Sequence, residues 1–185
     1  MKNCFFILLL VFPFIAGNAQ VIQKRSIQAV ETEIAGGVGV GFNKMGFDQN
    51  QLAYSIKGEI RYNTPSGAFD FGLGAQLVRL DRLSYDTQHH DAFPSWQVYA
   101  AGDYNWRIND YLTLFCGLAA GVSRWTQTSA YSLSITPNKW SPYIAPRVGI
   151  EAWNRLRFTI TASIMNKETS FIGLSLGYSF GGKPL

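Results

Sequence analysis

Beyond its first twenty residues, the sequence has no apolar run of 18 residues and therefore no candidate transmembrane helix. It is also poor in charge, since Asp, Glu, Lys and Arg make up 15% of the chain, against roughly 25% of an ordinary soluble domain. Aromatic residues reach 15%, and there are 18 glycines. Low charge without a long hydrophobic run indicates apolar residues that are spread thinly, as they are in alternating strands. With 185 residues, the chain is expected to form one domain.

Cysteine is almost absent from the chain. The two cysteines are Cys4 and Cys116, and Cys4 falls in a segment that we expect to be removed. The mature chain then has no second thiol for an internal disulfide, which excludes a disulfide-stapled secreted domain. Basic runs are missing too, and the formal net charge of +4 falls to +3 once Lys2 is lost. We therefore expect no nucleic-acid partner.

The N-terminal residues have the pattern of a secretory signal peptide. Lys2 provides the positive start, and a short apolar core runs from Phe5 to Ala16. Gly17 and Ala19 are the small residues that precede a cut after Ala19. The core is too short for a membrane anchor. The residue after the cut is not Cys, which argues against a lipoprotein. We predict a signal peptide at 1–19 and one mature domain at 20–185; the alternative is a buried N-terminal helix.

The mature chain alternates between apolar and polar residues in eight segments, and a period of two predicts β-strands. In Tyr54–Tyr62, Ile56 and Ile60 share one face, whereas Glu59 and Arg61 share the other. The segments have about the length that a tilted strand needs to cross a bilayer, roughly 9–11 residues. The predicted strands are Glu31–Phe42, Tyr54–Tyr62, Phe69–Leu77, Trp96–Arg107, Leu112–Ser123, Tyr143–Ala152, Leu156–Ile164 and Phe171–Phe180.

Connections between these segments are short at one end and mostly long at the other. Short turns fall at 63–67, 108–110 and 153–155, and longer loops at 43–51, 81–95 and 127–139, with one short turn at 166–168. Transmembrane barrels have short periplasmic turns and longer extracellular loops. The predicted fold is therefore all-β, an eight-stranded antiparallel up-and-down transmembrane β-barrel over residues 20–185. Its even strand number places both termini in the periplasm.

Large aromatic residues of the apolar face gather near the short-turn end. Such rings form a girdle where a membrane meets water, and a soluble barrel has no reason to place them all at one end. The predicted periplasmic girdle consists of Tyr62, Phe69, Trp106, Trp153, Tyr178 and Phe180. The apolar face then faces lipid. Two soluble alternatives, a lipocalin-like barrel with an apolar cavity and a secreted β-sandwich, would turn it inward.

The polar face is expected to line the lumen. It is rich in Gly, Ala and Ser, which suits the narrow interior of an eight-stranded barrel, and a Lys or Arg turned to lipid at mid-bilayer costs roughly 2–4 kcal/mol. Matching faces across the turns puts Arg61 opposite Asp70 and Glu151 opposite Arg157, pairs that offset each other's desolvation. The predicted structural network of lumen charges consists of Lys57, Glu59, Arg61, Asp70, Asp103, Arg107, Arg147, Glu151 and Arg157.

The segment Gly173–Phe180, GLSLGYSF, alternates and closes on an aromatic residue. It is similar to the C-terminal signal that the barrel-assembly machinery reads, although residues 181–185 follow it here. With its strand number and loop asymmetry, the chain from Glu31 to Phe180 resembles small outer-membrane barrels of the OmpX or OmpA-barrel type. Gln20 after the cut and the trailing Gly-Gly-Lys resemble barrel proteins of Bacteroidota-type bacteria. The resemblance implies a Gram-negative outer membrane, contact with its lipid and lipopolysaccharide, and insertion by the barrel-assembly machinery.

Candidate catalytic and metal-binding residues are sparse. His89, His90 and Asp91 are possible metal ligands, but neighbours in an extended chain point apart, and no further group completes a site. The same histidines with Ser84 and Ser95 are the candidates for a lipid A-modifying enzyme, yet no Ser and His share a strand face at hydrogen-bonding spacing. We predict no catalytic residue, metal or cofactor. The alternatives are a lipid A-modifying enzyme and a narrow pore lined by the lumen charges.

The long loop from Trp125 to Trp140 alternates further through Tyr131, Leu133 and Ile135. A hairpin projecting beyond the membrane exposes a strand edge, which binds partners by strand addition. We therefore predict a protein partner at 125–140. The predicted role is structural, surface-interaction or accessory-subunit, without catalytic activity.

Overall fold

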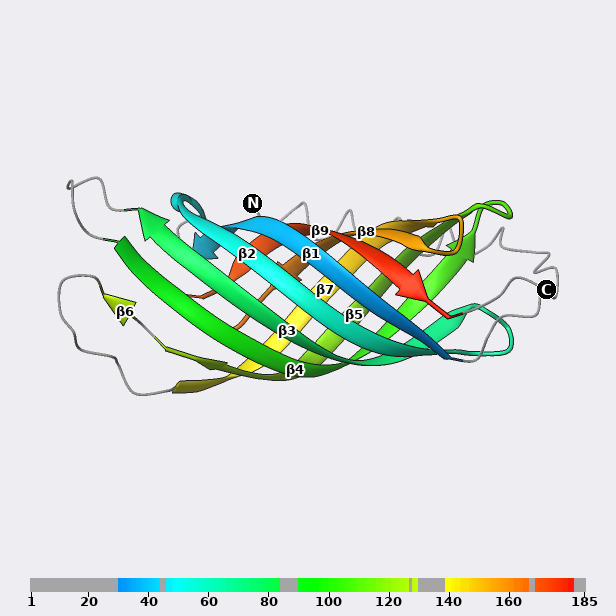
Figure 1. Cartoon of the computed structure of the whole chain (residues 1–185), viewed down its shortest axis with the longest axis horizontal. Coiled ribbons are helices and arrows are strands. Elements are labelled where there is room, and N and C mark those ends of the chain that lie inside the picture. The colour runs from blue at the N-terminus through cyan, green and yellow to red at the C-terminus, as the bar shows by residue number, and fades with distance from the viewer. Residues whose placement is uncertain are drawn as a thin grey trace.

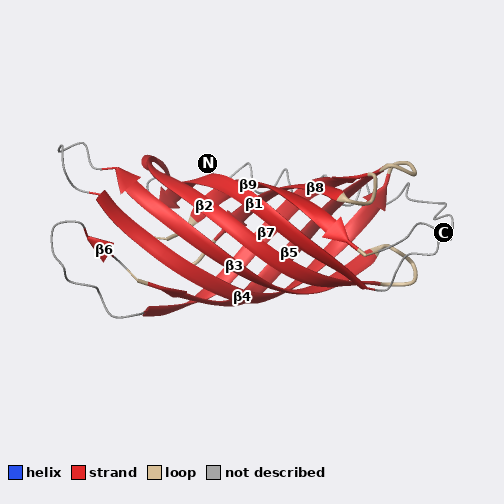
Figure 2. Cartoon of the chain, viewed as in Figure 1, coloured by secondary structure: helices blue, strands red, loops and turns tan. Residues whose placement is uncertain are grey.

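A computed structural model describes residues 30–43, 46–83, 90–126, 128–129, 139–166 and 169–181. All the regular elements in these ranges are β-strands, as Figure 2 shows. They are β1 (Val30–Asn43), β2 (Gly46–Asn63), β3 (Phe69–Leu83), β4 (His90–Arg107), β5 (Leu112–Trp125), β6 (Thr128–Ser129), β7 (Lys139–Ala152), β8 (Leu156–Ser163) and β9 (Phe171–Phe180). No helix in the described part of the chain is both long and apolar enough to span a membrane. The predicted signal peptide lies outside the described residues.

Eight of these strands close into a barrel, which Figure 1 shows from the side. They pair antiparallel in the order β3-β2-β1-β9-β8-β7-β5-β4, and the pairing of β3 with β4 completes the ring. The first and last strands are neighbours, with Thr32 opposite Phe180. The two-residue β6 pairs with the edge of β4 at Asp91 and Ala92. The prediction of an eight-stranded antiparallel up-and-down barrel is confirmed.

Through most of its length, the barrel has an apolar outside and a polar inside. In β2, Ile56 and Ile60 are more than half exposed on the outer face, whereas Glu59 and Arg61 are 2% and 1% exposed in the lumen. This arrangement is the reverse of a soluble barrel. It matches the cost of placing charged side chains in lipid.

Toward the long-loop end, the two faces exchange character. On β3, Leu80 is buried inside and Arg79 is exposed outside, and Phe93 of β4 is likewise buried opposite Leu80. Because the pattern inverts here, the predicted loops 43–51 and 81–95 are wrong in their bounds. β2 already begins at Gly46, and β4 at His90. The backbone ladder continues although the contrast between lipid-facing and lumen-facing residues does not.

The hairpin turn between β7 and β8 fixes the register at the short-turn end. Trp153 and Asn154 both have positive φ, 53° and 54°, as the two central residues of a type I′ turn must. A backbone hydrogen bond of 3.1 Å closes the turn. Asn adopts this conformation readily, whereas a bulky residue such as Trp rarely does. The turn sets Glu151 opposite Arg157, which confirms the pairing predicted from the sequence.

Candidate functional site

Arg147 of β7 holds the middle of the lumen together. Its guanidinium donates to both carboxylate oxygens of Glu59 on β2, at 2.6 and 2.9 Å, and to both of Asp103 on β4, at 2.7 and 2.8 Å. The planar fork of arginine suits such bidentate contacts. All three side chains are buried, and Arg157 of β8 also donates to Asp103. One buried cluster therefore joins four strands across the barrel.

Arg61 of β2 forms a second centre of the network. Its guanidinium lies 3.5 Å from carboxylate oxygens of both Glu31 and Glu33, on β1. It also lies 3.4 Å from the carboxylate of Glu151 on β7, and it donates to the hydroxyl of Ser179 on β9 at 2.7 Å. The fully buried guanidinium thus connects β2 with its neighbour β1 and also with β7 and β9, which do not pair with β2 in the sheet.

Most of the predicted lumen charges meet in these two centres. Lys57 joins them through Glu33, at 3.0 Å. Asp70 lies apart and accepts a hydrogen bond of 2.7 Å from the side-chain amide of Asn105. Arg107 takes part in none of the network's ion pairs among the described residues. The predicted residues that the ion pairs bring together are Lys57, Glu59, Arg61, Asp103, Arg147, Glu151 and Arg157.

The predicted pairing of Arg61 with Asp70 is wrong. Arg61 lies opposite Gly72, and Asp70 lies opposite Asn63. Gly67, at φ 67°, allows a turn at Thr64–Gly67. The centre of the hairpin thus lies one residue farther along the chain than predicted, so the partner of each residue differs by two. A shift of two keeps every side chain on its own face. For this reason the alternation could not reveal the error.

Glu31 and Glu33 were not predicted as members of the network. Both are charged residues on the inward parity of the first strand, which is the signal that identified the other members. The structure gives Glu33 a place between three cations: Lys57 at 3.0 Å, Arg61 at 3.5 Å and Arg157 at 3.8 Å. Such a site cannot be assigned before the stagger of the strands around the barrel is known.

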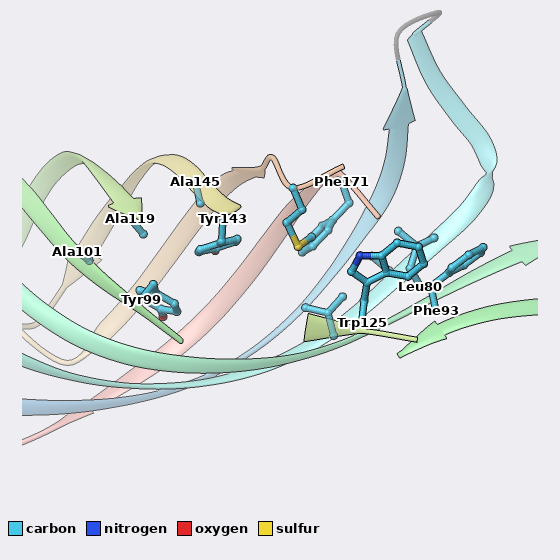
Figure 3. Close-up of a cluster of buried hydrophobic side chains, with 12 residues drawn as sticks. Leu80, Phe93, Tyr99, Ala101, Ala119, Trp125, Tyr143, Ala145 and Phe171 are labelled. Atoms are coloured by element: carbon cyan, nitrogen blue, oxygen red, sulfur yellow. The ribbon is translucent and has the colours of Figure 1, made fainter. Parts of the chain in front are cut away.

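Aromatic rings fill the lumen beyond the ionic network, and the sequence had given them no role. Figure 3 shows Tyr99 and Tyr143 facing each other, with ring centroids 5.6 Å apart. The Tyr99 hydroxyl donates to Glu59 at 3.1 Å, so this hydrogen bond links the ring pair to the ionic network. Farther toward the long-loop end, Phe93 and Trp125 lie 6.3 Å apart. The space beside the tyrosines is about 20 Å³, enough for roughly one water molecule.

The residues of the predicted girdle surround the short-turn end. Tyr104, which the prediction did not include, extends this set, because its ring lies 4.9 Å from Phe69 and 4.6 Å from Trp106. Tyr178 and Phe180 also form an edge-on pair, at 4.9 Å. The predicted members exposed on the outer surface are Tyr62, Phe69, Trp153, Tyr178 and Phe180, and Trp106 is half-buried.

The candidates for chemistry fall largely outside the described residues. These residues exclude Ser84 and His89 altogether, and also the side chains of His90 and Asp91. Ser95 is buried in the lumen, where its hydroxyl accepts a hydrogen bond of 2.9 Å from Gln97. Within the described ranges, no group of three or more His, Cys, Asp or Glu side chains could hold a metal ion. Of the predicted partner segment 125–140, the structure describes 125–126, 128–129 and 139–140.

No protein-family model matches the sequence, and no curated protein matches it. Among solved structures, the chain is similar to Neisserial surface protein A, with a TM-score of 0.59 at 12% identity over 83% of this chain and 97% of that one. At such low identity, the likeness shows the fold alone. Two further matches have TM-scores under 0.5, which is too low to support the assignment of a fold. They are the N-terminal β-barrel domain of Pseudomonas aeruginosa OprF (0.47, 13% identity, 84% and 100% covered) and the attachment invasion locus protein Ail of Yersinia pestis (0.45, 18%, 82% and 97%).

The closed barrel and this structural likeness together confirm the predicted resemblance at the level of fold. The chain has the fold of a small eight-stranded outer-membrane β-barrel.

Proposed function

We propose that the chain is an integral outer-membrane barrel with a structural, surface-interaction or accessory-subunit role and no catalytic activity. The filled lumen carries this proposal. Ionic side chains occupy it around Arg61 and Arg147, and aromatic side chains occupy it from Tyr99 to Trp125. The cavity beside Tyr99 and Tyr143, of about 20 Å³, is far too small for a lipid or peptide substrate. A small barrel packed in this way serves as a rigid support rather than as a pore.

The lumen network has a structural role in this proposal. Its cations and carboxylates come from different strands, so each ion pair restrains the position of one strand against another. A buried charge that keeps its partner is compensated, whereas one that loses its partner is strongly destabilising. The network thereby favours one stagger of the strands over the alternatives that alternation alone would permit.

The orientation of the barrel follows from its two unlike ends. The short turns and the aromatic girdle face the periplasm, as do both termini, and the long-loop end faces the outside. The outer leaflet brings the protein into contact with lipid and lipopolysaccharide. This orientation implies a signal peptide at 1–19 that is removed after Ala19, and insertion by the barrel-assembly machinery. The tight turn at Trp153 and Asn154 supports the assignment, because periplasmic turns are the short ones.

Surface interaction is assigned to the side of the barrel formed by β2 to β5. β2 and β4 have 18 residues each, whereas β8 has 8. Because roughly 9–11 residues cross a bilayer, the long strands project beyond it on one side. β6 lies along the edge of β4 in this projecting part. A partner at 125–140 would therefore meet a strand that the barrel already holds in place.

Conductance in planar bilayers tests the central part of the proposal. The purified mature protein should insert without producing current steps, because side chains fill its lumen. Lipid A from cells that overexpress the protein should also keep its acylation pattern in mass spectrometry. Steady current steps, or a new acyl chain on lipid A, would contradict the proposed role.

A deletion pair tests the assignment of the surface. Removing residues 128–136 should abolish co-purification of a native membrane partner in mild detergent. Removing residues 84–89 from the neighbouring loop is the control and should leave that partner in place. Heat-modifiable mobility in SDS gels reports whether each barrel remains folded. Retention of the partner in both folded variants would remove the loop from the proposal.

A further inference from the structure

Outward-facing charges begin abruptly at the long-loop end of the barrel. On β5, the outer face carries only apolar or small side chains from Leu112 to Val122. At about 3.3 Å per residue and a tilt near 40°, this span is roughly 25 Å high. The next outward residue is Arg124. It therefore lies where the hydrocarbon layer ends and the lipid headgroups begin.

Two tryptophans flank Arg124 in one row across the outer surface. Trp96 of β4 lies opposite Arg124, and Arg124 lies opposite Trp140 of β7. The guanidinium carbon lies 5.8 Å from the centre of the Trp140 ring. The two indole rings meet edge-on with centroids 5.3 Å apart. The tryptophans thus form an aromatic wall beside a cation that no carboxylate neutralises among the described residues.

Arg79 of β3 shows how the neighbouring outward cation differs. Its guanidinium donates to the carboxylate of Asp81 at 2.8 Å, so its charge is already balanced. At the corresponding height, the described outer faces of β1, β2, β8 and β9 carry no Lys or Arg. Among the described residues, Arg124 is therefore a cation without a carboxylate partner. It lies on one side of the rim, the height at which outward-facing charges begin, within reach of headgroup phosphates.

We infer that Arg124, with Trp96 and Trp140, binds the phosphate group of a phosphorylated lipid in the outer leaflet. The inference rests on the proposed outer-membrane orientation. A guanidinium presents two parallel donors that match phosphate oxygens. Tryptophan lies preferentially at the membrane interface, where its ring contacts acyl chains and its N–H reaches the polar layer. The apolar band below holds the acyl chains, so the site takes a lipid and not a free anion.

The test uses the full mature protein in detergent micelles and native mass spectrometry to count bound lipid. The probes are dipalmitoyl phosphatidic acid and dipalmitoylglycerol, which differ only in the phosphate. We expect phosphatidic acid to bind saturably and dipalmitoylglycerol to bind at least about tenfold more weakly, as expected for charge-assisted hydrogen bonds. Equal binding of the two lipids would overturn the inference.

Two matched variants locate the site. Arg124→Gln should weaken phosphatidic acid binding about tenfold, while Arg79→Gln should change it less than about twofold, because Arg79 already has Asp81 as its partner. Arg124→Lys keeps the charge but lacks the two parallel donors of the guanidinium. Its affinity for phosphatidic acid should lie between those of Arg124→Gln and Arg79→Gln. Equal losses in Arg124→Gln and Arg79→Gln would show non-specific attraction and would overturn the site. Heat-modifiable mobility confirms that each variant is folded.

Inorganic phosphate separates the lipid from a free anion. At millimolar concentration, it should not displace phosphatidic acid, because it lacks the acyl chains. Displacement would show a simple anion site and would overturn the inference. Membrane fractionation of cells distinguishes this outcome from a failure of the proposed function. If the chain reaches the outer membrane but no lipid binds, only the inference fails; if it does not reach that membrane, the proposed function fails as well.

Discussion

The membrane-spanning part of the barrel and the part that projects beyond it are built from the same strands with opposite polarity. In β3, Leu77 points outward below the rim, whereas Leu80 points inward above it. In β5, Val122 faces out, Arg124 follows it on the same face, and Trp125 turns in. Strand geometry is continuous across this change. The medium around the strand therefore decides which face is apolar, and the boundary between the two parts marks where lipid gives way to water.

The two parts also differ in what fills them. In the spanning part, buried charges depend on partners from other strands. In the projecting part, a conventional core of Leu80, Phe93 and Trp125 excludes water, and the cations Arg79 and Arg124 lie on the outer face. Substitutions should consequently be most damaging where a charge is left without its partner, and least damaging at the exposed ion pair.

The largest effect is expected for Arg147→Ala. It leaves Glu59 buried without its ion-pair partner and leaves Asp103 with Arg157 alone, and breaking a buried ion pair costs about 3–5 kcal/mol. Urea unfolding in lipid vesicles, followed by heat-modifiable mobility, measures the change in the free energy of unfolding. The control, Arg147→Met with Glu59→Gln, removes the cation together with its carboxylate, keeps Asp103 paired with Arg157, and should recover most of the loss. A double variant as unstable as Arg147→Ala would show that packing, not charge, is responsible.

Trp125→Ala should rank next. Truncating a buried tryptophan removes apolar contacts and leaves a cavity, at a cost of about 3 kcal/mol. The loss should be confined to the projecting part, where Trp125 packs against Phe93. Hydrogen exchange of backbone amides can localise it. Faster exchange around Phe93 with unchanged exchange around Glu59 is expected, and uniform acceleration would show that the two parts unfold as one.

A smaller effect is expected for Tyr99→Phe. The ring and its contact with Tyr143 remain, but the hydrogen bond to Glu59 is lost. A net hydrogen bond to a charged group contributes about 1.5–3 kcal/mol, and Arg147 still holds the carboxylate here, so the lower end is expected. The same urea experiment measures it. A loss as large as that of Arg147→Ala would mean that the tyrosine, and not the arginine, holds Glu59 in place.

The smallest effect is expected for Arg79→Ala, which removes the exposed pair with Asp81. Water and salt screen such a pair, so the urea midpoint should not shift measurably. The double change Arg79→Ala with Asp81→Ala is the control and should behave in the same way. A clear shift in the single variant would indicate that this end of the barrel is drier than its exposure implies.

Alternation was sufficient to predict the faces of the strands but not their positions around the ring. Glu59, Arg61 and Arg147 were assigned to the lumen from parity alone. That Arg147 lies between Glu59 and Asp103 depends on the stagger of three strands, which no local pattern records. The register error at Arg61 has the same origin, because a shift by two residues changes partners without changing faces.

Residues beyond the rim were the hardest to predict. The signal that identified strands was an apolar outer face, and this signal reverses at Arg79 and Arg124. Phe93 was therefore assigned to a loop and Leu80 was left beyond the end of a predicted strand, although they are buried opposite each other in a ladder. The inward tyrosines were misjudged for a related reason. On a face expected to hold small residues, Tyr99 and Tyr143 had no evident role until each was seen against the other.

The seam between β1 and β9 joins residues that are almost a full chain length apart, with Thr32 beside Phe180. The other long ladders of the barrel join strands that follow one another closely in sequence. Loop-closure entropy makes such distant pairing slow, so this seam is expected to form last and to limit the rate of folding. A circular permutant that links β9 to β1 through a short turn and opens the chain at 84–89 would make this seam local. The pairing of β3 with β4 should then limit the rate of folding instead.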